Sequence, residues 1–130
     1  MKAFFALVGA FCGWFFGGLD SFLYLLIIFV VVDYITGVLS ATISCEVSSS
    51  RGVKGIMKKM LIFLLVGMGN ALDMALVGGT SPIRTAVIFF YLSNEGISIL
   101  ENITKIGLPV PQSLRRALGK LKEGEENELN

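Results

Sequence analysis

Four ionisable residues lie inside or at the ends of long apolar stretches, where a charge is costly. They are Asp33, Asp73, Arg84 and Glu95. At bilayer depth such side chains must be neutral, pair with an opposite charge or face water, and they commonly mark ion paths and proton relays. The sequence therefore predicts the chemistry of buried charges in a membrane, where carboxylates bind protons or cations or line water.

Asp33 and Glu95 fall at nearly the same predicted depth. At 1.5 Å per residue, Asp33 lies about 16 Å and Glu95 about 18 Å from the outer ends of their helices. We expect both to be buried in the bundle or to face a water-filled lumen, away from lipid. Asp73 and Arg84 flank a short turn, and we predict that they form a structural ion pair.

Few residues favour catalysis or metal binding. The chain has no histidine, and its two cysteines, Cys12 and Cys45, lie in different segments without metal-ligand spacing. The serines at 48–50 are interpreted as a linker, because no histidine or recognisable intramembrane protease motif accompanies them. We therefore predict that the protein is not an enzyme and that it uses no cofactor and no metal.

Apolar helices must position these charges. The chain is 54% hydrophobic and 16% charged, with a mean hydropathy of +0.75, which predicts an all-α integral membrane protein. We expect a small bundle of three to four transmembrane helices in a domain spanning 1–104, with helices near 3–17, 22–43, 60–78 and 83–100. The segment 3–17 would reach only about 22 Å as a helix, and the sequence leaves open whether it crosses the membrane.

Basic residues cluster outside the apolar stretches. Residues 105–130 are predicted to form a basic amphipathic helix followed by an acidic tail, and the charge bias places this C-terminus in the cytoplasm and the 78–82 turn outside. The net charge of +1 carries no information about nucleic acid, and what matters is where the charges lie. We expect membrane lipid as a partner and no nucleic acid. The predicted inner-leaflet contacts are Arg51, Lys54, Lys58, Lys59, Arg115, Arg116, Lys120 and Lys122.

Glycines recur every four residues in the first segment, at Gly9, Gly13 and Gly17. Such spacing places small residues on one helical face, where a second helix can approach closely. The same spacing also arises from the general abundance of glycine in membrane helices. Self-association into a homo-oligomer is one of the two interpretations.

An ordered set of residues resembles the toxin-secretion/phage-lysis holin family over about residues 20–122. The set is Asp33-Tyr34-Ile35-Thr36-Gly37, then Ser49-Ser50-Arg51-Gly52-Val53-Lys54-Gly55 with Lys58 and Lys59, then Asp73, Arg84, Tyr91 and Glu95, then Ser98-Ile99-Leu100-Glu101-Asn102, and finally Gly107-Leu108-Pro109-Val110-Pro111. Together these elements are far more specific than any one of them.

This resemblance implies a phage or prophage protein that oligomerises in the bacterial inner membrane and permeabilises it. The lesion would release a cell-wall hydrolase (an endolysin) or a toxin from the cytoplasm. A small four-helix proton-coupled exporter is the alternative, in which Glu95 would bind a proton and a cationic substrate in turn. Induced expression separates the two, since a holin stops growth whereas an exporter raises tolerance to toxic cations.

Overall fold

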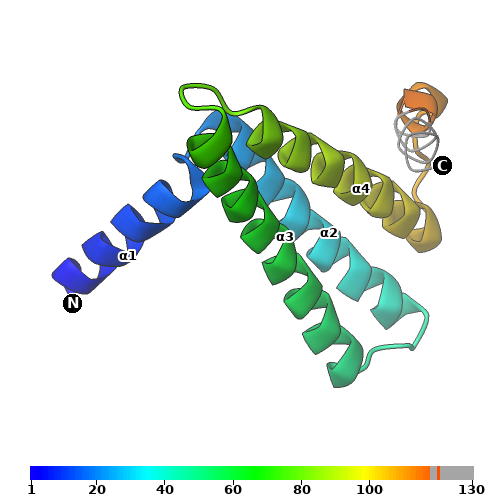
Figure 1. Ribbon diagram of the computed structural model, residues 1–130. Helices are drawn as coiled ribbons and strands as arrows, with labels where there is room; N and C mark the ends of the chain where they lie inside the picture. The colour runs from blue at the N-terminus through cyan, green and yellow to red at the C-terminus, as the bar shows by residue number, and fades with distance from the viewer. Residues whose placement is uncertain (118–119, 121–130) are drawn as a thin grey trace.

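The described part of the chain forms four helices, followed by a short helical segment over 112–117 (Figure 1). The computed structural model describes residues 1–117 and 120. The four helices are α1 (Lys2–Phe16), α2 (Ser21–Ile43), α3 (Ser49–Leu76) and α4 (Pro82–Ile106). Three of them, α2, α3 and α4, are long and apolar enough to cross a membrane, while α1 is shorter. The prediction of an all-α membrane protein is confirmed.

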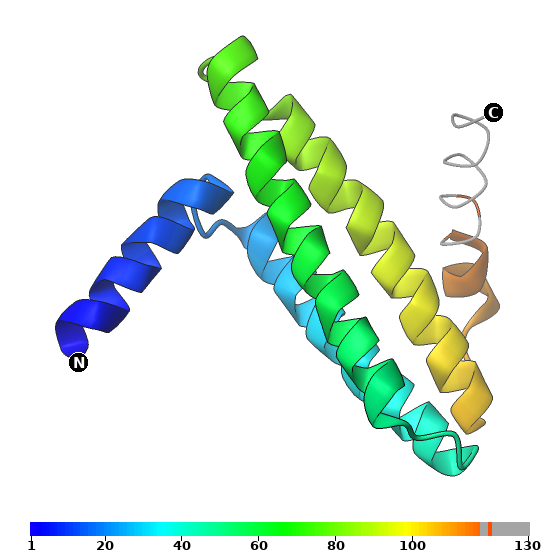
Figure 2. The same cartoon turned by 60° about the horizontal axis from the view of Figure 1, so that its bottom comes forward.

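Helices α2, α3 and α4 pack side by side into a bundle, in which α4 contacts both of its neighbours (Figure 2). An apolar core fills the half of the bundle nearest the α3–α4 turn. Most other apolar side chains on these helices, such as Ile35 and Leu65, point outward, as lipid requires. The core residues are Leu23, Leu26, Val30, Ile62, Val66, Ile88 and Leu92.

Helix α3 is longer than the apolar pattern indicates. The prediction of a helix beginning near residue 60 is wrong, because the serines and basic residues from Ser49 onward are helical. Gly52 and Gly55 in this added part lie against the ring of Tyr34 on α2, and glycine permits such close approach of helices. Helix α4 also continues beyond residue 100 and ends at Gly107, whose φ of 105° suits glycine.

Helix α1 splays away from the bundle and meets it at one end (Figures 1 and 2). It ends at Gly17, with a left-handed φ of 80°. The ring of Phe15 covers Gly67 of α3 so closely that a Cβ there would lie 2.0 Å from a ring carbon. All residues of this described helix are at least partly exposed, which leaves its apolar surface available to lipid or to another helix.

Candidate functional site

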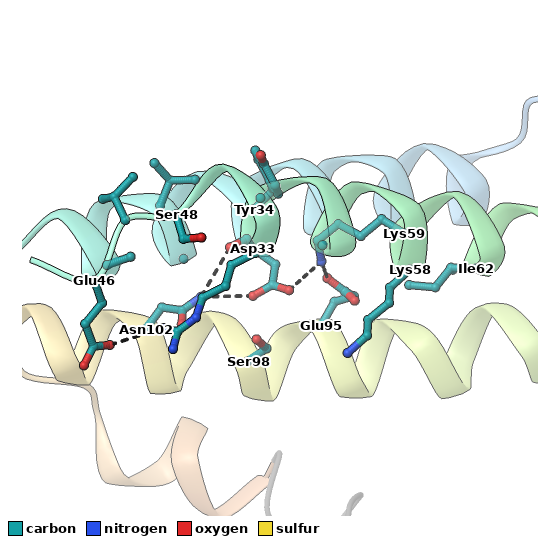
Figure 3. Close-up of a pocket in the computed structure, with 17 residues that line it drawn as sticks. Asp33, Tyr34, Glu46, Ser48, Lys58, Lys59, Ile62, Glu95, Ser98 and Asn102 are labelled. Carbon is teal, nitrogen blue, oxygen red and sulfur yellow. Dashed lines mark hydrogen bonds and ion pairs between the residues drawn. The ribbon is translucent and has the colours of Figure 1, made fainter. Parts of the chain in front are cut away.

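Lys59 joins the two carboxylates that the sequence places at one depth. Its Nζ lies 2.7 Å from Asp33 Oδ2 and 2.6 Å from Glu95 Oε2, so one ammonium links α3 to both α2 and α4 (Figure 3). Asp33 is 8% exposed and Glu95 7% exposed. Short charge-assisted bonds of this kind are stronger than neutral ones. We call Asp33, Lys59 and Glu95 the charged triad.

Asn102 completes the link between α2 and α4. Its Nδ2 donates to Asp33 Oδ1 at 3.0 Å, to the Asp33 carbonyl at 3.2 Å and to Thr36 Oγ1 at 3.0 Å. Asn102 lies on the same face of α4 as Glu95, because seven residues make nearly two helical turns. The Asn102 side-chain amide therefore holds the Asp33 carboxylate within hydrogen-bond distance of the Lys59 ammonium.

A cavity of about 420 Å³ lies beside the charged triad. We call it the chamber. It is bounded by α2, by the first turns of α3 and by α4, with Tyr34 and Ser98 among its lining residues. Glu46 and Arg51 lie at its edge and form an exposed ion pair of 3.8 Å. One half of the bundle thus holds the chamber and the charged triad, and the apolar core lies in the other half.

A second charged cluster holds the opposite end of the bundle. The Arg84 guanidinium donates to both carboxylate oxygens of Asp20, at 2.9 and 3.1 Å, and to the carbonyls of Phe16 and Gly18. This bond to Arg84 lowers the pKa of Asp20 from its ordinary value of 3.8. Since Asp20 also caps α2 through the Leu23 amide, this pair fixes the α1–α2 corner against α4.

The predicted side-chain ion pair between Asp73 and Arg84 is not the arrangement found. The Asp73 carboxylate instead accepts the backbone N–H groups of Ile83, at 2.9 Å, and of Arg84, at 2.8 Å. These are free amides at the start of α4, where a carboxylate is favoured. Asp73 on α3 therefore caps the N-terminus of α4. The Arg84 guanidinium pairs with Asp20 instead.

The predicted inner-leaflet residues divide into two groups. Lys59 is a correction, because its ammonium lies between two buried carboxylates rather than toward headgroups. The remaining described members are exposed, and the Arg115 guanidinium donates to Thr104 Oγ1 at 3.1 Å. Those members are Arg51, Lys54, Lys58, Arg115, Arg116 and Lys120. Lys122 and the predicted acidic tail lie outside the described residues.

The three glycines of the first segment do not form one continuous stripe. Gly9 and Gly13 face open space on α1, whereas Gly17 ends the helix. A Cβ at Gly17 would lie 2.3 Å from Asn70 Oδ1. Gly17 therefore serves the α1–α3 contact within the chain, and only Gly9 and Gly13 remain as the predicted self-association face.

Comparison with known proteins places the chain in a family. Residues 10–123 match the bacteriophage holin family. The chain belongs to that family. A probable holin of Bacillus phage phi105 is 36% identical over 91 residues, covering 70% of this chain and 67% of the relative. No solved structure matches the chain.

Similar proteins also occur in bacteria. An uncharacterised protein of Clostridium perfringens is 42% identical over 88% of this chain and 86% of its own length. An uncharacterised protein of Listeria monocytogenes is 43% identical over 92% of this chain and 86% of its own length. The similarity of these two bacterial proteins to this chain therefore extends over the whole α2–α4 bundle.

Sequence reasoning missed four contributors to the contacts between helices in this holin-family protein. Asn102, Asn70, Asp20 and the bridging role of Lys59 become evident only in the structure. For Asn102 a signal existed, since it follows Glu95 by seven residues on the same face of α4. For Asn70, which donates to the carbonyls of Trp14 and Phe15 at the end of α1, the sequence gives no comparable indication.

Proposed function

We propose that this holin-family protein oligomerises in the bacterial inner membrane and permeabilises it without enzymatic chemistry. The lesion lets an endolysin, or in some settings a toxin, leave the cytoplasm. Membership of the bacteriophage holin family carries this proposal. Three helices able to span a membrane and a largely exposed apolar surface support it.

One subunit offers no open path through its own bundle. The chamber ends at the charged triad, and the apolar core occupies the remaining half of the described bundle. A water-filled lesion therefore requires separation of α2–α4 or assembly of several subunits around water. The exposed side of α1 with Gly9 and Gly13 is the proposed contact for assembly.

Orientation follows from charge. The exposed basic residues of α3 and of the 112–117 segment are proposed to face the cytoplasmic leaflet, where anionic lipids attract them. The chamber then opens toward the cytoplasm and the α3–α4 turn lies outside. In this proposed orientation the C-terminus of the multi-pass protein lies in the cytoplasm.

The test is induced expression in bacteria that also produce a muralytic enzyme lacking its own export signal. We expect growth to stop and the membrane potential, followed with a voltage-sensitive dye, to collapse before the culture lyses. Cells without the muralytic enzyme are the control, and these should depolarise without rapid lysis.

The exporter alternative is favoured by one observation, that the buried Glu95 carboxylate borders the chamber. It predicts growth on induction, an intact potential and greater tolerance of toxic organic cations. That combination, at membrane levels matching those that should depolarise cells, would contradict the holin proposal.

A further inference from the structure

The walls of the chamber are mainly apolar. The charged triad lies at one end of the chamber, where Lys59 contacts both acids. No sealed side-chain nitrogen or oxygen in the described part of the chain lacks a hydrogen-bond partner, so the triad calls for no further ligand. The space beside the triad is therefore suited to an apolar occupant. The apolar side chains that line it are Val38, Ala41, Val47 and Ile62.

The chamber lies where α3 and α4 separate. The two helices are in close contact near their turn, where a Cβ at Gly69 would lie 3.3 Å from the Arg84 backbone, and they diverge from there along their lengths (Figure 1). Ile35 and Leu39 alternate with lining residues along α2, but they point outward and are each 51% exposed. Large exposed apolar side chains of this kind require contact with lipid or with another protein surface. The chamber therefore opens at a depth where lipid chains are present.

A basic stripe borders this opening on α3. At about 100° per residue, Arg51, Lys54 and Lys58 fall on one side of the helix, and Arg51 and Lys58 line the chamber. In Figure 3 the Lys58 side chain extends from α3 toward α4. The first turns of α3 therefore present cations beside the chamber, while their opposite side carries exposed apolar residues. Those residues are Val53, Ile56 and Met57.

Two of these cations are uncompensated. Arg51 pairs with Glu46 at 3.8 Å. Lys54 and Lys58 are exposed and make no ion pair within residues 1–117 and 120. Exposed lysines near a membrane surface attract anionic lipid headgroups. The rim of an apolar chamber thus carries two ammonium groups able to bind a phosphate.

We propose that the chamber binds one anionic phospholipid, with an acyl chain along its apolar walls and the phosphate on Lys54 and Lys58. An occupant with a negative head and a hydrocarbon tail matches both the rim and the walls. A helix of a second copy fits less well, because a helix is about 10 Å across and a volume of about 420 Å³ holds only about one turn of it. The proposal rests on insertion of α2–α4 in the membrane but not on lysis.

The experiment measures which lipid reaches the chamber in the full chain, reconstituted in vesicles of phosphatidylcholine and phosphatidylglycerol. Trp14→Phe removes the single native tryptophan, and Val38→Trp places one in the lining. Leu39→Trp is the matched control, because it is the adjacent residue with similar exposure but does not line the chamber. The acyl chains of one lipid at a time are brominated, since bromine quenches the fluorescence of a tryptophan that it contacts.

We expect tryptophan at position 38 to be quenched with about a tenfold preference for phosphatidylglycerol, since each nearby basic residue attracts anionic lipid. Position 39 should show little preference between the two lipids. Lys58→Gln should lower the preference at position 38 by about fivefold, whereas Lys105→Gln, at an exposed lysine that does not line the chamber, should not. Inorganic phosphate should not displace the lipid, because the tail is bound as well. Circular dichroism of each variant checks folding.

Equal quenching by the two lipids at position 38 in a folded protein would overturn the proposal. So would loss of quenching by both lipids there with normal quenching at position 39, a result that would indicate a second copy over the chamber. Displacement by inorganic phosphate would indicate an anion site without a bound tail and would also contradict the proposal. Because the assay requires no lysis, its failure leaves the proposed holin function testable, and a failed lysis assay likewise leaves the lipid site testable.

Discussion

Lys58 and Lys59 are adjacent, yet they have different environments. Successive residues of an α-helix point about 100° apart, which lets Lys59 reach the two acids while Lys58 stays exposed, although both line the chamber. The Lys59 side chain is 17% exposed and bridges two acids, whereas Lys58 is exposed. The bridge replaces water around each charge with charged partners, which is the condition for keeping ions inside a bundle.

Lys59→Met should destabilise the bundle by about 3 kcal/mol, because it leaves two buried carboxylates without their shared partner. Lys58→Met, an identical change at an exposed neighbour, should alter stability by less than about 0.5 kcal/mol. Unfolding in detergent, titrated with a denaturing detergent and followed by circular dichroism, measures both. Equal stability of the two variants would mean that the triad contributes nothing to the fold.

Asp20→Asn should destabilise the folded protein by about 1 kcal/mol near neutral pH, since it removes a charge from a partly exposed pair. Asparagine still caps α2, so the change isolates the bond to Arg84. The folded pKa of Asp20 lies below 3.8; its stabilisation is therefore present above that value and lost as the pH falls through the folded pKa. The stability difference between parent and variant should shrink in acid.

Glu46→Gln is the control for the Asp20 prediction. It disrupts a 3.8 Å pair whose side chains are 73% and 65% exposed, and exposed pairs of this kind contribute little. Its stability should match that of the parent at every pH. A difference between parent and Asp20→Asn that stays constant in acid would contradict a role for the Asp20 charge.

The four helices depend on different kinds of contact, and the sequence reveals them unequally. Apolar run length predicts α2 nearly to its ends, since lipid imposes that pattern. The start of α3 is not predictable in this way, because its first turns are polar and are ordered by packing of Gly52 and Gly55 on Tyr34. The predicted pairing of Arg84 with Asp73 is also wrong. The position of these two residues on either side of a turn does not indicate that Asp73 accepts hydrogen bonds from the first backbone amides of α4.

Gly69→Val should separate α3 from α4 and cost about 1–3 kcal/mol, the usual effect of overpacking. A Cβ at Gly69 would lie 3.3 Å from both the Cα and the backbone nitrogen of Arg84, and backbone cannot move aside as a flexible side chain can. Gly9→Val, on the open side of α1, should leave unfolding of the bundle unchanged. Disulfide crosslinking between cysteines introduced across α3 and α4 provides a second readout.

At the scale of the whole molecule, the apolar core of the bundle lies between two charged clusters, the charged triad and the cluster around Arg84, with α1 extending to the side. The buried core residues come from α2–α4, and Phe16 at the end of α1 packs against them, while Phe4, Phe11 and Trp14 of α1 are exposed. Composition predicts that such surfaces meet lipid or another subunit, but it does not predict the splayed angle of α1. That geometry arises from hydrogen bonds of Asn70 and Arg84 to the carbonyls at the end of α1.

Gly13→Leu should weaken self-association, because a branched side chain prevents close approach of a second helix to the open side of α1. Phe11→Leu is the matched control, since residue 11 is exposed and about 200° around the helix from Gly9 and Gly13. Chemical crosslinking in membranes should give fewer oligomers for Gly13→Leu alone, with slower lysis. Equal oligomer yields would show that this side of α1 meets only lipid.

The charge distribution of the molecule predicts its orientation. Basic residues are favoured on the cytoplasmic side of a membrane. If the bundle were inverted, both basic groups would lie outside, those from Arg51 to Lys58 and those from Arg115 to Lys120. The Gly78–Gly79 turn carries no charge. In a background lacking Cys12 and Cys45, cysteines at Ser49 and Ser113 should react with a membrane-impermeant thiol reagent only after the cells are opened. A cysteine at Thr80 should react in intact cells, and this internal control shows that the reagent reaches the protein. Labelling of position 49 or 113 in intact, still-polarised cells would overturn the orientation, and with it the opening of the chamber toward the cytoplasm.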